Sequence, residues 1–248
     1  MYIKWFVNVI ILAKNTPFCY NGSIMRLRRK KHLDERLELS KEYLLYFEER
    51  EHYGRPDPKD YPKLDFKTVF GNDNPVHMEI GCGKGGFITE LASKTPDINY
   101  IAVEKDDNVT VSAVENAKKA GLKNVKFIIC CAENLFLLIN DGTIGRIYLN
   151  FSCPYPKHTY RNRRLTNPKF LQMYRSFLAK GGGVFQKTDN KPFFDYSLES
   201  YALSGYRTEK VTKDLYNSDY LEGNVATEYE KKFVLYGETI CRVEAYPD

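Results

Sequence analysis

From Val76 onward, short apolar runs alternate with amphipathic stretches, in the order expected of strands and helices that build a parallel sheet. The predicted strands are Val76–Ile80, Tyr100–Glu104, Val125–Cys130, Arg146–Phe151, Gly183–Lys187, Tyr206–Leu215 and Ile240–Ala245. The predicted helices are Gly86–Ser93, Asn108–Ala120, Pro168–Leu178 and Phe193–Ser204. The pattern predicts a doubly wound α/β sheet that binds its ligand at the carboxyl ends of the strands.

A chain of 248 residues fits one such domain with additions before it. We expect the α/β domain over residues 63–248, preceded by a basic arm, a helix and a linker over residues 25–62. The helix is predicted at Leu33–Arg50, which is rich in Glu, Leu and Lys, and the linker at Gly54–Pro62.

The first residues carry an apolar run, Trp5–Ala13. The run is too short to span a bilayer, which takes about 20 residues, so we expect no membrane association. Met25 directly precedes a basic cluster and is the start that we expect for the native chain. Residues 1–24 are therefore interpreted as an extension upstream of that start.

A glycine-rich turn follows the first predicted strand. The segment Glu79–Gly86 reads EIGCGKGG, and Gly81, Gly83 and Gly85 allow a tight turn that brings the backbone close to a ligand. The same segment satisfies the GxGxxG pattern of dinucleotide-binding folds. The turn alone leaves a methyl-donor site, a dinucleotide site and a turn without any ligand as alternatives.

Two carboxylates accompany this turn. Glu104 ends the second predicted strand, where a carboxylate accepts hydrogen bonds from ribose hydroxyls in enzymes that use NAD or S-adenosylmethionine. Glu79 stands just before the glycines, where its charge attracts the sulfonium or the amino-acid portion of S-adenosylmethionine. A pyrophosphate would gain little from that charge, because anions prefer bare amide groups. Glu79 therefore favours S-adenosylmethionine as the cofactor.

Basic residues gather in two clusters, although the formal net charge is only +5. One cluster is Arg26, Arg28, Arg29, Lys30 and Lys31, and the other is Lys157, Arg161, Arg163, Arg164 and Lys169, interleaved with Tyr155, His158 and Tyr160. Such clusters are either solvated faces or RNA-binding surfaces, since basic side chains neutralise phosphates and flat rings stack on bases. The RNA-contact candidates are Arg28, Arg29, Arg161, Arg163 and Arg164.

The six cysteines include no CxxC pair, and the four histidines lack metal-ligand spacing. We therefore expect neither a metal site nor a disulfide framework. Reduced thiols indicate the cytoplasm. Monomer and homodimer both remain open.

Polar motifs in the second half of the chain identify a family. In chain order they are Leu149–Lys157 (LNFSCPYPK), Arg163–Thr166 (RRLT), Lys187–Asn190 (KTDN), Asn217–Ser218 (NS), Glu222–Asn224 (EGN) and Thr227–Glu230 (TEYE). This series resembles the bacterial tRNA (guanine-N7)-methyltransferases. The resemblance implies a class I methyltransferase fold, a Rossmann-like sheet of seven strands with the last antiparallel. It also implies methyl transfer from S-adenosylmethionine to a guanosine of the variable loop of tRNA.

The resemblance also implies binding positions. The family's methyl-donor positions fall at Glu79, Glu104, Cys131 and Cys153. Its guanosine and tRNA positions fall at Lys157, Asp189, Thr227, Glu228, Tyr229 and Glu230.

Three of this chain's residues depart from the family pattern. Cys153 and Tyr155 stand where the motif has Asp and Trp, and Cys131 stands where an Asp follows the third strand. Glu133 is expected to supply the missing acceptor near the adenine. Cys153 occupies the catalytic Asp position, but a thiol with a pKa of about 8.5 is mostly neutral at pH 7 and stabilises a cationic product less well than a carboxylate does.

The target nitrogen, guanine N7, has a free lone pair and no proton. No general base is therefore required, and most of the rate can come from alignment. The Watson–Crick edge offers N–H donors, for which Asp189 and Glu230 are the expected acceptors. In the alternative interpretation, Asp189 caps the following helix and Glu230 lies on a solvated helix face.

Two other functions stay open from the residues alone. An NAD(P)-dependent oxidoreductase fits the glycine pattern, although the chain shows no obvious hydride-site His or Tyr-x-x-x-Lys pair. A tRNA-binding protein of this fold with weakened or lost catalysis fits Cys131 and Cys153.

Overall fold

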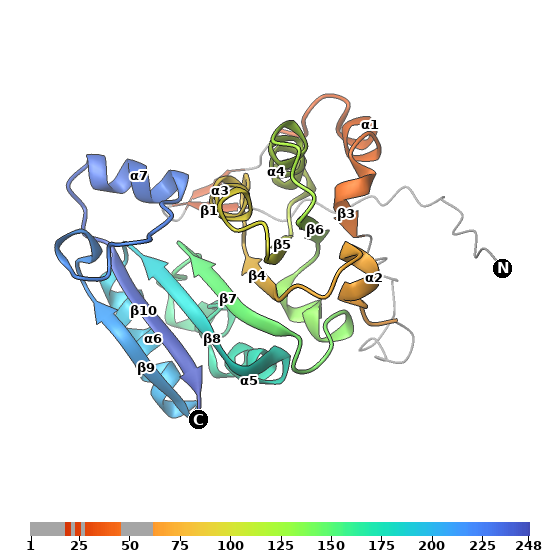
Figure 1. Ribbon diagram of the computed structural model, residues 1–248. Helices are drawn as coiled ribbons and strands as arrows, with labels where there is room; N and C mark the ends of the chain where they lie inside the picture. Colours follow the sequence, from red (N-terminus) through yellow and green to blue (C-terminus); the bar gives the residue numbers. More distant parts are fainter. Residues whose placement is uncertain (1–17, 21–22, 26–27, 46–61) are drawn as a thin grey trace.

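A single mixed sheet carries most of the strands in the computed structural model, which describes residues 18–20, 23–25, 28–45 and 62–248 (Figure 1). The strand order is β3-β6-β5-β4-β7-β8-β10-β9. These strands are β3 (Leu44–Leu45), β4 (Val76–Ile80), β5 (Asn99–Glu104), β6 (Val125–Ile129), β7 (Ile144–Asn150), β8 (Leu178–Thr188), β9 (Tyr206–Thr212) and β10 (Cys241–Pro247). Strands β1 (Phe18–Tyr20) and β2 (Ser23–Met25) form a separate antiparallel pair.

The topology confirms the predicted fold class. Strands β3 to β8 pair in parallel, and β10 pairs antiparallel with both β8 and β9. All seven predicted strands are present, although β8 begins at Leu178 rather than at Gly183. The sheet has one strand more than predicted, because β3 is added at the edge beside β6.

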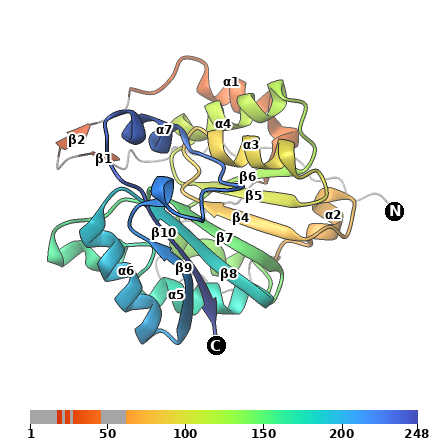
Figure 2. The same cartoon turned by 60° about the vertical axis from the view of Figure 1, so that its left-hand side comes forward.

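Helices cover both faces of the sheet (Figure 2). They are α1 (Leu33–Glu38), α2 (Phe66–Phe70), α3 (Gly86–Lys94), α4 (Asp107–Lys119), α5 (Pro168–Phe177), α6 (Lys191–Leu203) and α7 (Glu228–Leu235). Successive side chains of β5 pack on opposite faces of the sheet. Tyr100 and Ala102 pack in the cluster that contains α3 and α4, whereas Ile101 and Val103 pack in the cluster that contains α5 and α6. No helix among the described residues is long and apolar enough to cross a membrane.

The predicted helix Leu33–Arg50 is wrong over residues 39–45. Helix α1 ends at Glu38, a short 3-10 turn follows at Lys41–Tyr43, and the chain then extends as β3. Burial explains the change, because an extended Leu44 pairs with Phe127 and becomes 7% exposed. The end of the predicted helix, the predicted linker except for Pro62, and the run Trp5–Ala13 lie outside the described residues.

The segment before β3 is fixed to α4 by polar contacts. Arg36 donates two hydrogen bonds to Glu115, at 2.7 and 2.6 Å. The side-chain oxygen of Asn108 accepts from the Lys30 backbone N–H at 2.7 Å, and its amide donates to the Arg28 carbonyl at 3.0 Å. The basic residues 28–31 are thus held beside the first turn of α4.

Candidate active site

Five neighbouring parallel strands, β6, β5, β4, β7 and β8, end along one edge of the sheet. The predicted site residues stand at or just beyond these ends: Cys131 after β6, Glu104 in β5, Glu79 in β4, Cys153 after β7 and Asp189 after β8. Polar groups at the carboxyl ends of parallel strands are placed to meet one ligand.

The glycine turn between β4 and α3 has the backbone conformation that glycine favours. Gly81, Gly83 and Gly85 have φ values of 83°, 57° and 76°. At Gly85 a Cβ would lie 2.7 Å from the Cβ of Ala113 in α4, so this glycine also permits close packing. The amides of Gly81 and Cys82 donate to the Val103 carbonyl at 2.8 and 3.0 Å, which ties the turn to β5.

Glu104 closes the far side of this turn. Its Oε2 accepts from the Gly83 amide at 3.2 Å, and its Oε1 accepts from the amides of Lys105 and Asp106 at 2.8 and 3.2 Å. Burial raises the pKa of Glu104, while these amide hydrogen bonds lower it. A carboxylate has about four acceptor positions, so Glu104 keeps one for a ligand hydroxyl.

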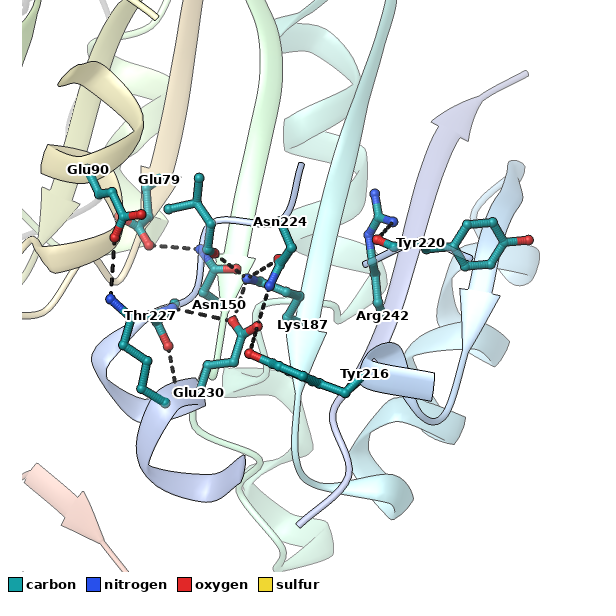
Figure 3. Close-up of polar contacts among 12 residues, drawn as sticks. Glu79, Glu90, Asn150, Lys187, Tyr216, Tyr220, Asn224, Thr227, Glu230 and Arg242 are labelled. Carbon is teal, nitrogen blue, oxygen red and sulfur yellow. Dashed lines mark hydrogen bonds and ion pairs between the residues drawn. The ribbon is translucent and has the colours of Figure 1, made fainter. Parts of the chain in front are cut away.

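Glu79 is a buried carboxyl with one unsatisfied oxygen (Figure 3). The Asn150 side-chain amide donates to Glu79 Oε1 at 3.0 Å, and Oε2 has no hydrogen-bond partner within the described chain. Burial raises the pKa of Glu79 to about 8, opposed by Asn150 and by the charge of Lys187. An orphaned acceptor of this kind calls for a partner from outside the protein, preferably a cation or a donor.

The loop after β7 adopts a strained backbone. Phe151 and Tyr155 have φ values of 51° and 41°, in the left-handed region that bulky residues rarely adopt. Arg164 braces this loop, because its guanidinium donates to the carbonyls of Pro154 at 2.9 Å and Tyr155 at 3.1 Å. Half-buried Cys153 lies between the two left-handed residues.

The rest of the second basic cluster faces solvent. Lys157, Arg161 and Arg163 are exposed, and the Arg163 guanidinium lies 5.0 Å from the ring centroid of Tyr160. Arg28 and Arg29 are also exposed, and Arg29 pairs with Asp34. Arg164 differs from these candidates, because its guanidinium is used within the protein and lies 4.2 Å from the ring centroid of Tyr196.

The C-terminal motif returns to the glycine turn. Helix α7 lies beyond the ends of β7 and β8 and beside α3 in both views (Figures 1 and 2). A Cβ at Gly86 would lie 3.2 Å from Cγ of Glu228, and Lys231 pairs with Glu90 of α3 at 3.4 Å. Thr227 begins α7 in a capping box with Glu230, and Tyr229 is 45% exposed.

Glu230 and Lys187 form a buried ion pair beside this edge (Figure 3). Their side chains are 0% and 8% exposed, and Lys187 Nζ lies 2.5 Å from Glu230 Oε2. The interpretation of Glu230 as a residue of a solvated helix face is therefore wrong. Burial lowers the pKa of Lys187, and the charge of Glu230 opposes this shift.

Asp189 follows β8 and is half-buried, and burial raises the pKa of its carboxyl. It does not cap the next helix. Asn190 does so instead, because its side-chain oxygen accepts from the Phe193 amide at 2.8 Å. The alternative interpretation, in which Asp189 caps the following helix, is therefore wrong.

The two residues expected near the adenine lie after β6. Cys131 precedes the 3-10 helix Ala132–Leu137, and Glu133 in that helix pairs with Lys169 at 3.5 Å. The Glu133 side chain is 51% exposed. Its role as an adenine-side acceptor stays a prediction. The described residues contain no group of three or more His, Cys, Asp or Glu that could hold a metal ion.

The sequence did not single out Asn150, Lys187 and Asn224 as site residues. Each stood inside a polar motif, but none was given a role. The available signal was a polar side chain at the end of an apolar strand, since Asn150 ends β7 and Lys187 precedes the last residue of β8. The partners of Asn150 and Lys187, which are Glu79 and Glu230, come from distant parts of the chain.

Comparisons with known proteins show similarity to methyltransferases. A family model described as a putative methyltransferase matches residues 73–243. The tRNA (guanine-N(7)-)-methyltransferase of Bacillus subtilis (strain 168) is 46% identical over 188 residues, which is 76% of this chain and 87% of the relative. The protein of the same name from Bacillus licheniformis is 43% identical over 221 residues, which is 89% of this chain and 98% of the relative.

Solved structures support the fold. The 16S rRNA methyltransferase KamB has a TM-score of 0.54 and 17% sequence identity, over 75% of this chain and 95% of that chain. An antibiotic-related methyltransferase has a TM-score of 0.53 and 20% identity, over 79% of this chain and 96% of that chain.

Proposed function

We propose that the chain, which belongs to the tRNA (guanine-N7)-methyltransferase family, transfers a methyl group from S-adenosylmethionine to N7 of a guanine in tRNA. The observation that carries the proposal is the meeting of three features at one sheet edge. These are the glycine turn, the orphaned carboxyl of Glu79, and the Thr227–Glu230 segment packed against the start of α3.

The residues present fit S-adenosylmethionine. When bound, this molecule supplies an electrophilic methyl group on a positively charged sulfur. Glu79 would hold its cationic part, because a buried carboxyl with a free oxygen gains most from a cation. The remaining acceptor position of Glu104 suits a ribose hydroxyl. Cys131 and Glu133 would lie on the adenine side.

The protein's part in the chemistry is alignment. Guanine N7 needs no deprotonation, so no side chain has to act as a general base. We assign Asp189 to the Watson–Crick edge, because its half-buried carboxyl stands one strand away from the Cys153 loop. Lys157 and the exposed arginines Arg161 and Arg163 would bind phosphates. Cys153 would orient the base without a full negative charge.

A tRNA-binding protein of this fold with lost catalysis is the second candidate, and the observation that favours it is the pair of thiols at Cys131 and Cys153. The two candidates differ only in transfer. An oxidoreductase is no longer a candidate, because the family is one of methyltransferases.

Two measurements on the purified chain test the proposal. Calorimetry should detect binding of S-adenosylmethionine, and an unmodified tRNA transcript should accept labelled methyl groups from it. Binding of both ligands without incorporation would leave the catalytically inactive candidate. Failure to bind S-adenosylmethionine would refute the proposal itself.

A further inference from the structure

The buried lysine at the end of β8 has no capacity left for a ligand. Lys187 Nζ donates to Asn224 Oδ1 at 3.0 Å, to the Val225 carbonyl at 2.8 Å and to Glu230 Oε2 at 2.5 Å. An ammonium group has three donors, so these contacts use all of them. Nζ also lies 5.3 Å from the ring centroid of Phe87 in α3.

Glu230 is equally saturated (Figure 3). Its Oε1 accepts from the Tyr216 hydroxyl at 3.2 Å and from the Asn224 amide at 2.6 Å. Its Oε2 accepts from Lys187 and, at 3.3 Å, from the Thr227 backbone N–H. Four hydrogen bonds fill the four acceptor positions of a carboxylate, so Glu230 cannot accept from a guanine without losing one of them.

The ion pair fixes a segment that reaches the site. Glu230 is both the partner of Lys187 and the third residue of α7, where its side chain completes the capping box with Thr227. The same helix places Glu228 against Gly86 at the start of α3. The backbone of Lys187 also contacts the site, because its carbonyl accepts from the Phe151 amide at 2.8 Å. Phe151 begins the loop that contains Cys153.

We propose that Lys187 and Glu230 are positioning residues for guanine recognition: their buried ion pair holds residues 224–230 against the glycine turn, and neither side chain touches the base. The proposal rests on the proposed function, because it concerns the guanine side of that same site. Glu230, which was expected to accept hydrogen bonds from the guanine, thus becomes a residue that supports the guanine site, and Lys187, which the sequence did not single out, becomes its partner.

Coupling between the two residues is the signature of this arrangement. If the pair acts as one unit, breaking it from either side removes the same interaction, so the effects of two substitutions do not multiply. If Glu230 instead binds guanine directly, the Glu230 substitution changes the contact with the base, and a substitution of Lys187 does not have the same effect on guanine recognition. Inosine separates the cases further, since it lacks the N2 amino group of guanosine.

The test uses Lys187→Met, Glu230→Gln and the double variant of the full chain. For each, the KM for tRNA, kcat and the donor dissociation constant are measured, with guanosine or inosine at the target position. The exposed pair Lys213–Asp195, joined at 2.6 Å, provides a matched control cycle. All rates are taken at least 10 °C below the unfolding midpoint of the variant.

We expect each single variant to raise the KM for tRNA at least tenfold while the donor dissociation constant changes less than threefold. The double variant should match the worse single variant, and all three should change the guanosine-to-inosine preference by the same factor. The Lys213→Met and Asp195→Asn controls should leave all constants within twofold of the wild type.

Multiplicative effects in the double variant would overturn the proposal, as would a change in inosine preference in Glu230→Gln alone. Unchanged constants in both single variants would reduce the pair to a role in stability and would equally overturn it. If a single variant does not fold, the double variant decides, because it holds no unpaired buried charge, and a wild-type KM there contradicts the proposal. Absence of methyl transfer by the wild type would instead refute the proposed function.

Discussion

Replacing Glu79 with Gln should stabilise the ligand-free protein at neutral pH. Gln keeps the shape and the acceptor that receives the Asn150 amide, but it cannot ionise. The folded protein raises the pKa of Glu79 from 4.5 to about 8, because the carboxyl is buried. The wild type must therefore bind a proton at this site when it folds at pH 7, or bury a charge.

The magnitude follows from proton linkage. A pKa raised in the folded state contributes stability that is complete below pH 4.5 and is lost as the pH rises toward 8. At pH 7 the protein is 2.5 pH units above the unfolded value of 4.5, and at about 1.4 kcal/mol per unit the loss is about 3–4 kcal/mol. For a chain of this length that corresponds to about 6–16 °C in the unfolding midpoint.

Thermal unfolding of the wild type and Glu79→Gln between pH 5 and pH 8 measures this effect. The midpoint difference should be small at pH 5 and should grow steadily to pH 8 in favour of the variant. Glu133→Gln is the control, because Glu133 is a surface carboxylate, and it should change stability by no more than about 0.5 kcal/mol. A Glu79→Gln variant no more stable than the wild type at pH 7.5 would refute the reasoning.

The same carboxyl links donor binding to pH. Because a cationic donor prefers ionised Glu79, the wild-type affinity for S-adenosylmethionine should rise between pH 6 and pH 8, where the site deprotonates. The Gln variant should bind at least tenfold more weakly at pH 8 and should lose this rise. Calorimetry at several pH values measures both, and equal pH profiles for the two proteins would contradict the assignment.

Four further substitutions probe separate parts of the site. Asp189→Asn should lower methyl transfer to tRNA at least tenfold with donor affinity unchanged in calorimetry, and normal turnover would remove Asp189 from the guanine site. Cys153→Asp should leave kcat equal or higher, since it restores a charge next to the cationic product, and a large loss would give the thiol a function of its own. Arg164→Ala should lower thermal stability by about 1–3 kcal/mol, because two loop carbonyls lose their donor, whereas exposed Arg163→Ala should weaken tRNA binding in a filter assay without changing the unfolding midpoint. The reverse outcome for the two arginines would contradict their assignments.

Local pattern was sufficient to predict the sheet and the positions of its polar ends. Strand β4 is buried throughout, so its apolar run is visible in the sequence, and Glu79 stands out at its end. Glu104 follows from the same reasoning in β5. The role of Gly85 could also be predicted from the sequence, because a tight turn that enters a helix with a left-handed residue favours glycine.

Contacts between distant segments were beyond that reasoning. Lys187 and Glu230 are 43 residues apart, and no period or spacing connects them before the chain folds. Arg164 looked like its neighbours Arg161 and Arg163, yet the strained loop that it braces gives it a structural role. Strand β3 was missed because two residues at a sheet edge carry too little pattern to outweigh the helical composition before them.

The most direct measurement of the central claim compares two tRNA transcripts, one with guanosine and one with 7-deazaguanosine, in which a C–H group replaces N7. Both keep the Watson–Crick edge, so both should bind this chain in the presence of S-adenosylhomocysteine. Labelled methyl groups should enter the guanosine transcript alone. Equal incorporation into the 7-deazaguanosine transcript, or incorporation into neither, would contradict methyl transfer to guanine N7.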